Sequence, residues 1–203
     1  DGLTILHHLC LKCDDHVDLI KLAVNASNGI AILNARANNG VTPLYHAVKH
    51  GQTETVKFLL SLQDCDVNAG TKDGTSPLMD SVLHDRFEIA KYLLEKAADV
   101  CRHDQDGLTI LHHLCLKSDD HVDLIKLAVN ASNGIAILNS RDHNGATPLY
   151  YAVKYGQTKA VKFLLSVKDC DVNAGTKDGI SPLMESVLHD RFEIAKYLLE
   201  KAA

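Results

Sequence analysis

The sequence contains a long internal repeat. Residues 1–98 align without a gap with residues 106–203, an offset of 105 positions, and 13 of these 98 aligned pairs differ. The differing positions, numbered in the first copy, are 13, 35, 37, 38, 41, 46, 50, 54, 55, 62, 63, 75 and 80. Self-similarity of this kind indicates a repeat protein, in which neighbouring segments stack to bury a continuous core. The length of the chain is therefore a poor guide to the number of its domains.

Each copy divides again into shorter segments. Gly-x-Thr and Gly-x-Ser motifs recur at Gly2, Gly40, Gly74, Gly107, Gly145 and Gly179. They mark six segments of about 33 residues plus insertions: 1–38, 39–72, 73–105, 106–143, 144–177 and a truncated 178–203. A period of about 20–50 residues is typical of solenoids. We predict a single array over residues 1–203.

The segment 39–72 is best explained as two short helices. Thr42 suits the cap of a helix and Pro43 suits its first position. Apolar residues follow at i, i+3 and i+4, and Gly51 ends this helix. A second apolar stripe covers residues 56–60. Two such helices cannot bury their stripes alone, so the segments must stack into an all-α array.

These segments resemble the ankyrin repeat. The run Gly40-Val41-Thr42-Pro43-Leu44-Tyr45, the following Ala47–Gly51 and Val56–Leu60, and the closing Asp66-Val67-Asn68-Ala69 all match that family's pattern. The resemblance implies an all-α solenoid of stacked antiparallel helix pairs with hairpin-like turns, whose first helices and turn tips line a concave groove. Ile5 and Ile110 depart from the pattern because they replace its Pro, and the stretches 25–33 and 130–138 are expected to lengthen a loop.

Charge and composition exclude several functions. The chain has 21 Lys and Arg against 26 Asp and Glu, a net charge of −5, and lacks the clustered positive charge that nucleic-acid binding requires. No apolar run approaches the roughly 18 residues of a membrane span, and no signal peptide opens the chain. No catalytic or phosphate-binding motif is present. We predict a non-catalytic protein without a cofactor, a nucleic-acid partner or a membrane partner, in an intracellular, cytoplasmic location.

Cysteine and histidine patterns suggest a metal site only weakly. Cys10 and Cys13 form a Cys-x-x-Cys motif, but the second copy has Ser118 at the corresponding position. We predict that Cys10 is a reduced core thiol. The i, i+4 pair His46 and His50 could chelate a metal, yet Tyr replaces both in the second copy. We therefore predict no metal. The resemblance implies a structural hydrogen-bonding role for His7 and His112.

One helix face is the predicted binding surface. At about 100° per residue, two slots in each first helix point away from its apolar stripe, and none of their residues is aliphatic. They hold His8, Lys12, His46, His50, Asp80, His84, His113, Lys117, Tyr151, Tyr155, Glu185 and His189, with Lys49 and Lys154 beside them. The resemblance adds the turn-tip residues Asn38, Asn39, Val41, Lys72, Asp73, Thr75, His143 and Asn144. The alternative is an ordinary solvated helix face.

Two details favour binding. Tyr151 and Tyr155 are expected to present paired aromatics on this face, and Tyr is enriched at binding hot spots. The predicted contact positions also differ between the copies more often than the other positions do. The seven histidines on or near the face would make it cationic near pH 6.5. The predicted partner is a protein, of an identity that the sequence leaves open.

Other functions stay open at this point. The array could be a structural spacer or spring, or the targeting region of a larger multidomain protein. Apolar residues in the last segment, such as Phe192 and Leu199, suggest ends that stack head-to-tail on other copies. The resemblance also implies Asn hydroxylation at Asn68 and Asn173, against a purely structural role in which the side chain holds the turn.

Overall fold

The computed structural model describes residues 1–12, 15–26, 30–117, 121–131 and 135–202. It divides into two compact units, an N-terminal unit from Asp1 to Asp99 and a C-terminal unit from Val100 to Ala203. Within the described residues the fold is helical, and its β-structure is an isolated bridge between His103 and Thr109. No helix there has the length and apolar character that a membrane crossing needs.

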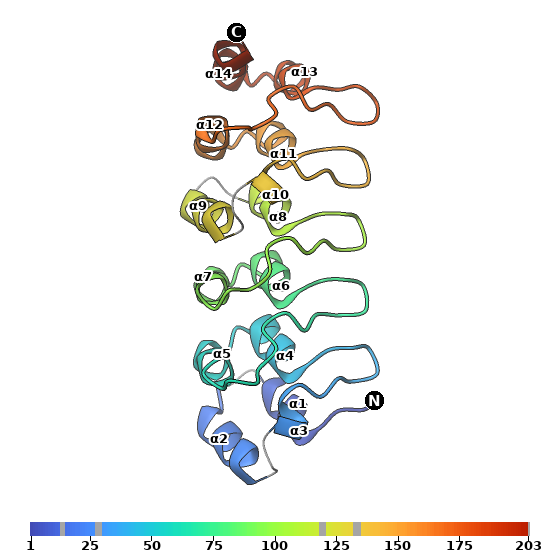
Figure 1. Ribbon diagram of the computed structural model, residues 1–203, viewed down its shortest axis with the longest axis vertical. Coiled ribbons are helices and arrows are strands. Elements are labelled where there is room, and N and C mark those ends of the chain that lie inside the picture. Colours follow the sequence, from blue (N-terminus) through green and yellow to red (C-terminus); the bar gives the residue numbers. More distant parts are fainter. Residues whose placement is uncertain (13–14, 27–29, 118–120, 132–134, 203) are drawn as a thin grey trace. The chain divides into compact units, whose positions relative to one another are not determined.

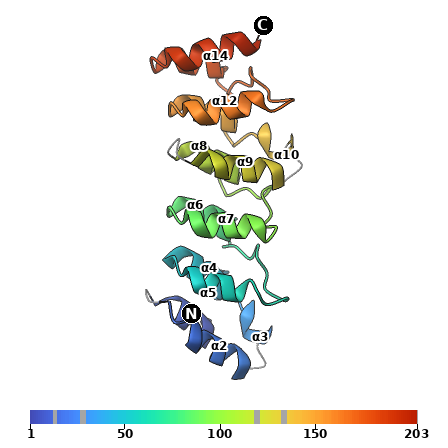
Figure 2. The ribbon, with the colours of Figure 1, turned by 90° about the vertical axis from the view of Figure 1, so that its left-hand side faces the viewer.

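The N-terminal unit consists of two rows of helices. Its helices are α1 (Ile5–Cys10), α2 (Val17–Ala26), α3 (Ile30–Leu33), α4 (Pro43–His50), α5 (Thr53–Leu59), α6 (Pro77–Leu83) and α7 (Phe87–Glu95). The first row, α1, α4 and α6, packs in chain order, and the second row of α2, α5 and α7 packs behind it (Figures 1 and 2). Fully buried aliphatic side chains such as Leu44, Leu59 and Leu93 fill the space between the rows. The predicted stacking of helix pairs is therefore confirmed within this unit.

The C-terminal unit has the same organisation. Its helices are α8 (Ile110–Leu116), α9 (Val122–Ala131), α10 (Ile135–Leu138), α11 (Pro148–Lys154), α12 (Thr158–Ser166), α13 (Pro182–Leu188) and α14 (Phe192–Ala202). Helices α8, α11 and α13 form the first row, and α9, α12 and α14 form the second. Leu111, Leu149 and Leu164 are fully buried between them.

Local sequence explains where the first helices begin and end. The Thr42 hydroxyl accepts a hydrogen bond from Tyr45 N, and Pro43 occupies the first turn of α4, as predicted. Gly51 ends α4 in the left-handed region at φ 74°, which glycine adopts without steric cost. In α1, which lacks the Pro, Thr4 is the N-cap.

Hairpin-like turns precede the first helices. Ala37 N donates to Val41 O at 2.9 Å, and Gly40 N donates to Ala37 O at 2.8 Å, with Gly40 at φ 85°. This is the pattern of a tight turn followed by a left-handed glycine. The same two bonds recur at 142–146 in the C-terminal unit. The backbone of each turn is thus held by its own hydrogen bonds.

The stretches expected to be loops are partly helical. Helix α2 extends to Ala26 and the short α3 follows it, and α9 and α10 do the same in the C-terminal unit. The reason is burial: Leu33 is 3% exposed and Leu138 is 1% exposed. An extra turn of helix places these apolar residues in the core while pairing their backbone groups.

Candidate binding surface

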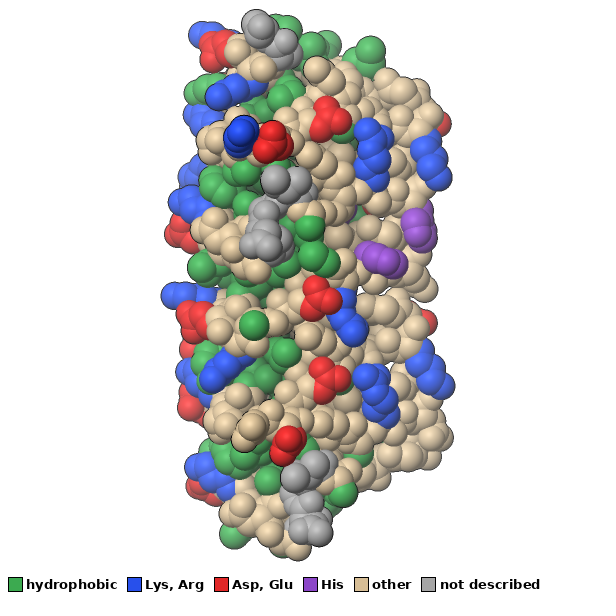
Figure 3. Space-filling model, in the orientation of Figure 1, with side chains coloured by type: hydrophobic (Ala, Val, Ile, Leu, Met, Phe, Trp, Pro, Cys, Tyr) green, Lys and Arg blue, Asp and Glu red, His purple; other side chains and the backbone are tan. Residues whose placement is uncertain are grey.

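In each unit, the turns and the adjoining first helices form the surface that was predicted from the sequence, here called the turn-side face. In Figure 1 the turns project from the same side of the first-row helices within each unit, and Figure 3 shows Lys, Arg and His side chains over them. The exposed members are His8, Lys12, Lys49, His84, Tyr155, His189, Asn38, Asn39, Lys72, Asp73, His143 and Asn144. The half-buried members are His46, His50, Lys117, Tyr151, Lys154 and Thr75, and Val41 is buried.

Three first-helix residues predicted on this face are, like the turn residue Val41, buried instead: Asp80, His113 and Glu185, each 3–4% exposed. Tyr45 donates its hydroxyl to Asp80 Oδ1 at 2.6 Å, and Tyr150 donates to Glu185 Oε2 at 2.9 Å. The prediction treated each helix as isolated, whereas α4 packs on α6 and α11 packs on α13. The slot therefore faces a neighbouring helix, and the carboxylate there is a buried acceptor for that helix's tyrosine.

The third buried residue belongs to a second kind of pair, between a turn and the helix that follows it. His113 Nε2 lies 2.9 Å from Asp104 Oδ2, nine residues earlier in the chain. The equivalent pair in the next turn is Tyr151, which donates its hydroxyl to Asp142 Oδ2 at 2.7 Å. Burial and this bond raise the pKa of the Tyr151 hydroxyl. Tyr151 is therefore half-buried and bonded, so the predicted pair of free aromatics is wrong for this residue.

Sequence reasoning missed these turn-to-helix pairs, although a signal was present. Positions 37 and 46 both differ between the copies, as Ala and His in the first and as Asp and Tyr in the second. Residues 37 and 46 are nine apart, as Asp104 and His113 are. A joint change at that spacing is what a bonded pair would produce.

Tyr155 and the two outer histidines remain accessible on the turn-side face. Tyr155 is 50% exposed at the end of α11, as predicted. The side chain of His84 is 45% exposed and that of His189 is 47% exposed. His189 Nε2 lies 3.0 Å from Glu185 Oε1, whereas His84 Nε2 lies 3.7 Å from Asp80 Oδ1. These side chains are therefore accessible to solvent on this face.

His7 and His112 have the structural role that the resemblance implied. His112 Nδ1 accepts a hydrogen bond from Thr109 N at 3.0 Å, so Nε2 carries the proton and donates to Ala146 O at 3.2 Å. His7 makes the matching bonds to Thr4 and Val41. Burial lowers the pKa of His112 to about 4, and protonation would add a second donor facing Thr109 N. These histidines act as neutral links between a cap and the next turn.

The structure has unbridged thiols at Cys10, Cys65, Cys115 and Cys170. Cys10 is fully buried, as predicted, and burial raises its pKa to about 12. Burial likewise raises the pKa of Cys65 to about 12 and that of Cys170 to about 11. Cys13, the other half of the Cys-x-x-Cys motif, lies outside the described residues. A high thiol pKa removes the thiolate that metal binding and redox chemistry use.

Asn68 joins two segments of the N-terminal unit by hydrogen bonds. Its Oδ1 accepts a hydrogen bond from Asp99 N at 2.8 Å, and its own N–H bonds Asp66 Oδ1 at 2.9 Å. This supports the structural role for Asn68. Asn173 is exposed and its N–H bonds Asp171 Oδ1 at 3.1 Å. Hydroxylation at either site stays a prediction.

Comparison with known proteins agrees with the helical repeat fold. The family model for ankyrin repeats in three copies matches residues 6–104, 100–176 and 118–203. An ankyrin repeat protein of variola virus is 32% identical over 52% of this chain, which covers 18% of that protein. The tyrosine-protein kinase Shark of Drosophila melanogaster is 33% identical over 47% of this chain, and the human SMC5-SMC6 complex localization factor protein 1 is 34% identical over 46%. The chain covers 10% and 8% of those two proteins. Ankyrin repeats are in general non-catalytic protein–protein interaction modules, and this chain belongs to the ankyrin repeat family.

Proposed function

We propose that the chain binds a protein partner through its turn-side face and performs no catalysis. The observation that carries the proposal is the 50% exposure of Tyr155 among the exposed polar side chains of that face. A large aromatic with one polar end supplies contact area at low entropic cost, which is why Tyr is common at binding hot spots. Exposed His189 supplies a further donor on this face of the C-terminal unit, and exposed Lys49 and His84 supply donors on the corresponding face of the N-terminal unit.

The backbone behind this face is suited to binding because its turns are already ordered. Adjacent turns bond one another: Asn38 N donates to Asp1 O at 3.1 Å, and Lys177 N donates to Asn144 O at 2.8 Å. A partner therefore has little backbone to immobilise, and less of the binding free energy is lost to ordering.

The test uses single substitutions that leave the core unchanged. Tyr155→Ala removes an exposed side chain, so we expect an unchanged unfolding midpoint and loss of at least tenfold in affinity for a partner captured with the unmodified chain. Leu22→Ala is the matched control, because Leu22 is 64% exposed on the second-row helix α2. If Tyr155→Ala and Leu22→Ala bind alike, the array is better explained as a spacer or as a targeting region that uses another surface.

A second candidate interaction, head-to-tail self-stacking, is favoured by one observation. Met184 and Val187 on α13 are 57% and 54% exposed, whereas Met79 and Val82, 105 positions earlier, are buried. We propose that the α13–α14 face packs on another ankyrin surface, such as that of a second copy. Sedimentation should then show mass rising with concentration, and Val187→Lys should abolish the rise. A concentration-independent mass would contradict self-stacking and leave partner binding untouched.

A cytoplasmic location fits this proposal, because described thiols such as Cys10 and Cys65 are free and reduced. Fractionation of the native cell tests it, and recovery with secreted proteins would contradict it.

A further inference from the structure

His46 has no hydrogen-bond acceptor among the described residues, unlike His113 and Tyr151 at the corresponding positions of the C-terminal unit. His113 pairs with Asp104, and Tyr151 pairs with Asp142. The turn residue at the corresponding place before His46 is Ala37, which has only a methyl group. Both ring nitrogens of His46 are buried atoms without a hydrogen-bond partner in the described part of the chain.

The carboxylate of Asp142 accepts two hydrogen bonds in the C-terminal unit. In the N-terminal unit, which has Ala37 at that position, another side chain accepts only one of the two. In the C-terminal unit Asp142 Oδ1 accepts from Ala146 N at 2.8 Å, which fixes the turn, while Oδ2 accepts from Tyr151. In the N-terminal unit Asn39 Oδ1 accepts from Val41 N at 3.1 Å and so fixes the turn instead. No group in the described residues takes the place of the second oxygen. The hydrogen bond without a counterpart is therefore the one to the His46 ring.

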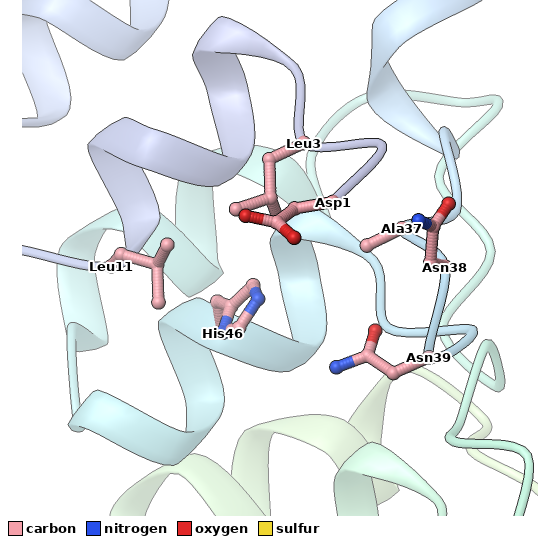
Figure 4. Close-up of a pocket in the computed structure, with 7 residues that line it drawn as sticks. All are labelled: Asp1, Leu3, Leu11, Ala37, Asn38, Asn39 and His46. Atoms are coloured by element: carbon pink, nitrogen blue, oxygen red, sulfur yellow. The ribbon is translucent and has the colours of Figure 1, made fainter.

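A pocket is lined by both Ala37 and His46, the positions whose counterparts Asp142 and Tyr151 bond one another in the C-terminal unit. Its volume is about 300 Å³, and it is lined by Asp1, Leu3, Leu11, Ala37, Asn38, Asn39 and His46. Figure 4 shows the His46 ring beside this space, with the amide of Asn39 across from it. Asn39 Oδ1 is held by Val41 N, so its amide nitrogen is left to donate. Two donors and apolar walls fit a carboxylate on a short aliphatic stem.

The charges around the pocket are compatible with that ligand. Lys49 and His50 flank His46 on α4, and the His7 ring on α1 meets the His46 ring edge-on at a centroid distance of 5.9 Å. Asp1 contributes the opposing negative charge. Asp106 of the C-terminal unit corresponds to Asp1, and the Asp142 carboxylate is buried beside it at 6% exposed. A second carboxylate is therefore tolerated beside an Asp at this position.

We propose that the His46 pocket binds the side-chain carboxylate of an Asp or Glu residue of the protein partner. The proposal rests on the proposed function, because it names the partner chemistry at one point of the turn-side face. The incoming carboxylate would accept hydrogen bonds from the His46 ring and from Asn39 Nδ2. It would thereby complete the arrangement that Asp104 and Asp142 complete within the chain.

The test needs no identified partner. N-acetyl-glutamate amide is titrated into the unmodified chain, up to about 100 mM to suit so small a ligand, and the His46 ring signals are followed by NMR. N-acetyl-glutamine amide is the neutral control. We expect saturable shifts at His46 with the glutamate probe alone, and a rise of at least one unit in the pKa of His46. Equal shifts with both probes, or none with either, would overturn the proposal.

A variant of the chain provides an independent arm. Ala37→Asp installs the side chain that residues 104 and 142 already have, so it should raise the pKa of His46 and abolish the response to the glutamate probe. Ala37→Asn, which introduces a neutral side chain of similar size, should leave the pKa of His46 unchanged. An unchanged His46 pKa in a folded Ala37→Asp chain would also overturn the proposal. Either failure leaves partner binding through Tyr155 standing, because that test uses a different unit and a captured partner.

Discussion

Removing the hydroxyl of Tyr45 should cost more stability than removing that of Tyr150, although the two residues occupy corresponding positions. Tyr45 donates to Asp80 Oδ1 at 2.6 Å, and Asp80 Oδ2 has no partner in the described residues. Glu185 accepts from Tyr150 with one oxygen and faces His189 Nε2 at 3.0 Å with the other. Tyr45→Phe therefore leaves a buried carboxylate without a close donor, while Tyr150→Phe leaves one donor in place.

The size of the difference follows from the cost of buried, charge-assisted bonds. Such a bond contributes about 1.5–3 kcal/mol, and a carboxylate that loses it also bears the desolvation penalty. We expect Tyr45→Phe to lower the free energy of unfolding by about 3 kcal/mol, the upper end of that range. Tyr150→Phe should lower the free energy of unfolding by about 1.5 kcal/mol, since His189 still donates a hydrogen bond to Glu185.

Urea unfolding followed by circular dichroism measures both values. Tyr92→Phe is the control, because the Tyr92 hydroxyl makes no hydrogen bond within the described residues, and it should change stability by less than about 0.5 kcal/mol. Asp80→Glu supplies the longer side chain of the second copy, so the cost of Tyr45→Phe should fall toward that of Tyr150→Phe in this background. Equal costs in the original background, or no change with Asp80→Glu, would refute the reasoning.

Two further predictions concern acid and the turns. Burial lowers the pKa values of His46 and His112 to about 4. The unfolded chain then binds more protons below about pH 6.5, so stability should fall from there toward pH 4, by up to about 3 kcal/mol for His112; NMR titration showing His112 charged at pH 6 would contradict this. A Cβ at Gly145 would lie 3.0 Å from Lys177 N, whereas one at Gly179 would meet nothing within 4 Å, and both glycines have positive φ. In urea unfolding, Gly145→Ala should therefore cost more than the strain of about 1 kcal/mol shared with Gly179→Ala, and equal costs would show that the contact relaxes freely.

Much of the fold follows from local chemistry that the sequence displays. The Thr-Pro pair before α4 and the glycine after it set the ends of that helix, and the 3.6-residue spacing of Leu44, Ala47 and Val48 sets its buried side. The helical character of α3 was less visible, because four apolar residues in a row carry no period. The burial of Leu33, in a helix that contacts α1 and α2, decides the conformation.

The binding surface was less predictable, because helix periodicity says nothing about what stands beside a helix. Asp80 and His84 occupy the two slots of α6 that were predicted to point outward, yet the side chain of His84 is 45% exposed and that of Asp80 is 5% exposed. The difference arises at α4, where Tyr45 reaches across to α6. Such a contact joins residues 35 apart and depends on how two helices pack.

The differences between the copies acquire a physical meaning once these contacts are known. Six of the 13 differing positions, 35, 37, 38, 41, 46 and 50, lie in one stretch around a turn and its first helix. In the C-terminal unit this stretch closes the space beside the helix with a Tyr151–Asp142 bond and places Tyr155 outside. In the N-terminal unit it leaves a pocket beside His46. Because the surrounding framework is so similar, these changes act on the surface rather than on the fold. The two units therefore present different side chains at corresponding places of the turn-side face, Tyr155 in one and the His46 pocket in the other.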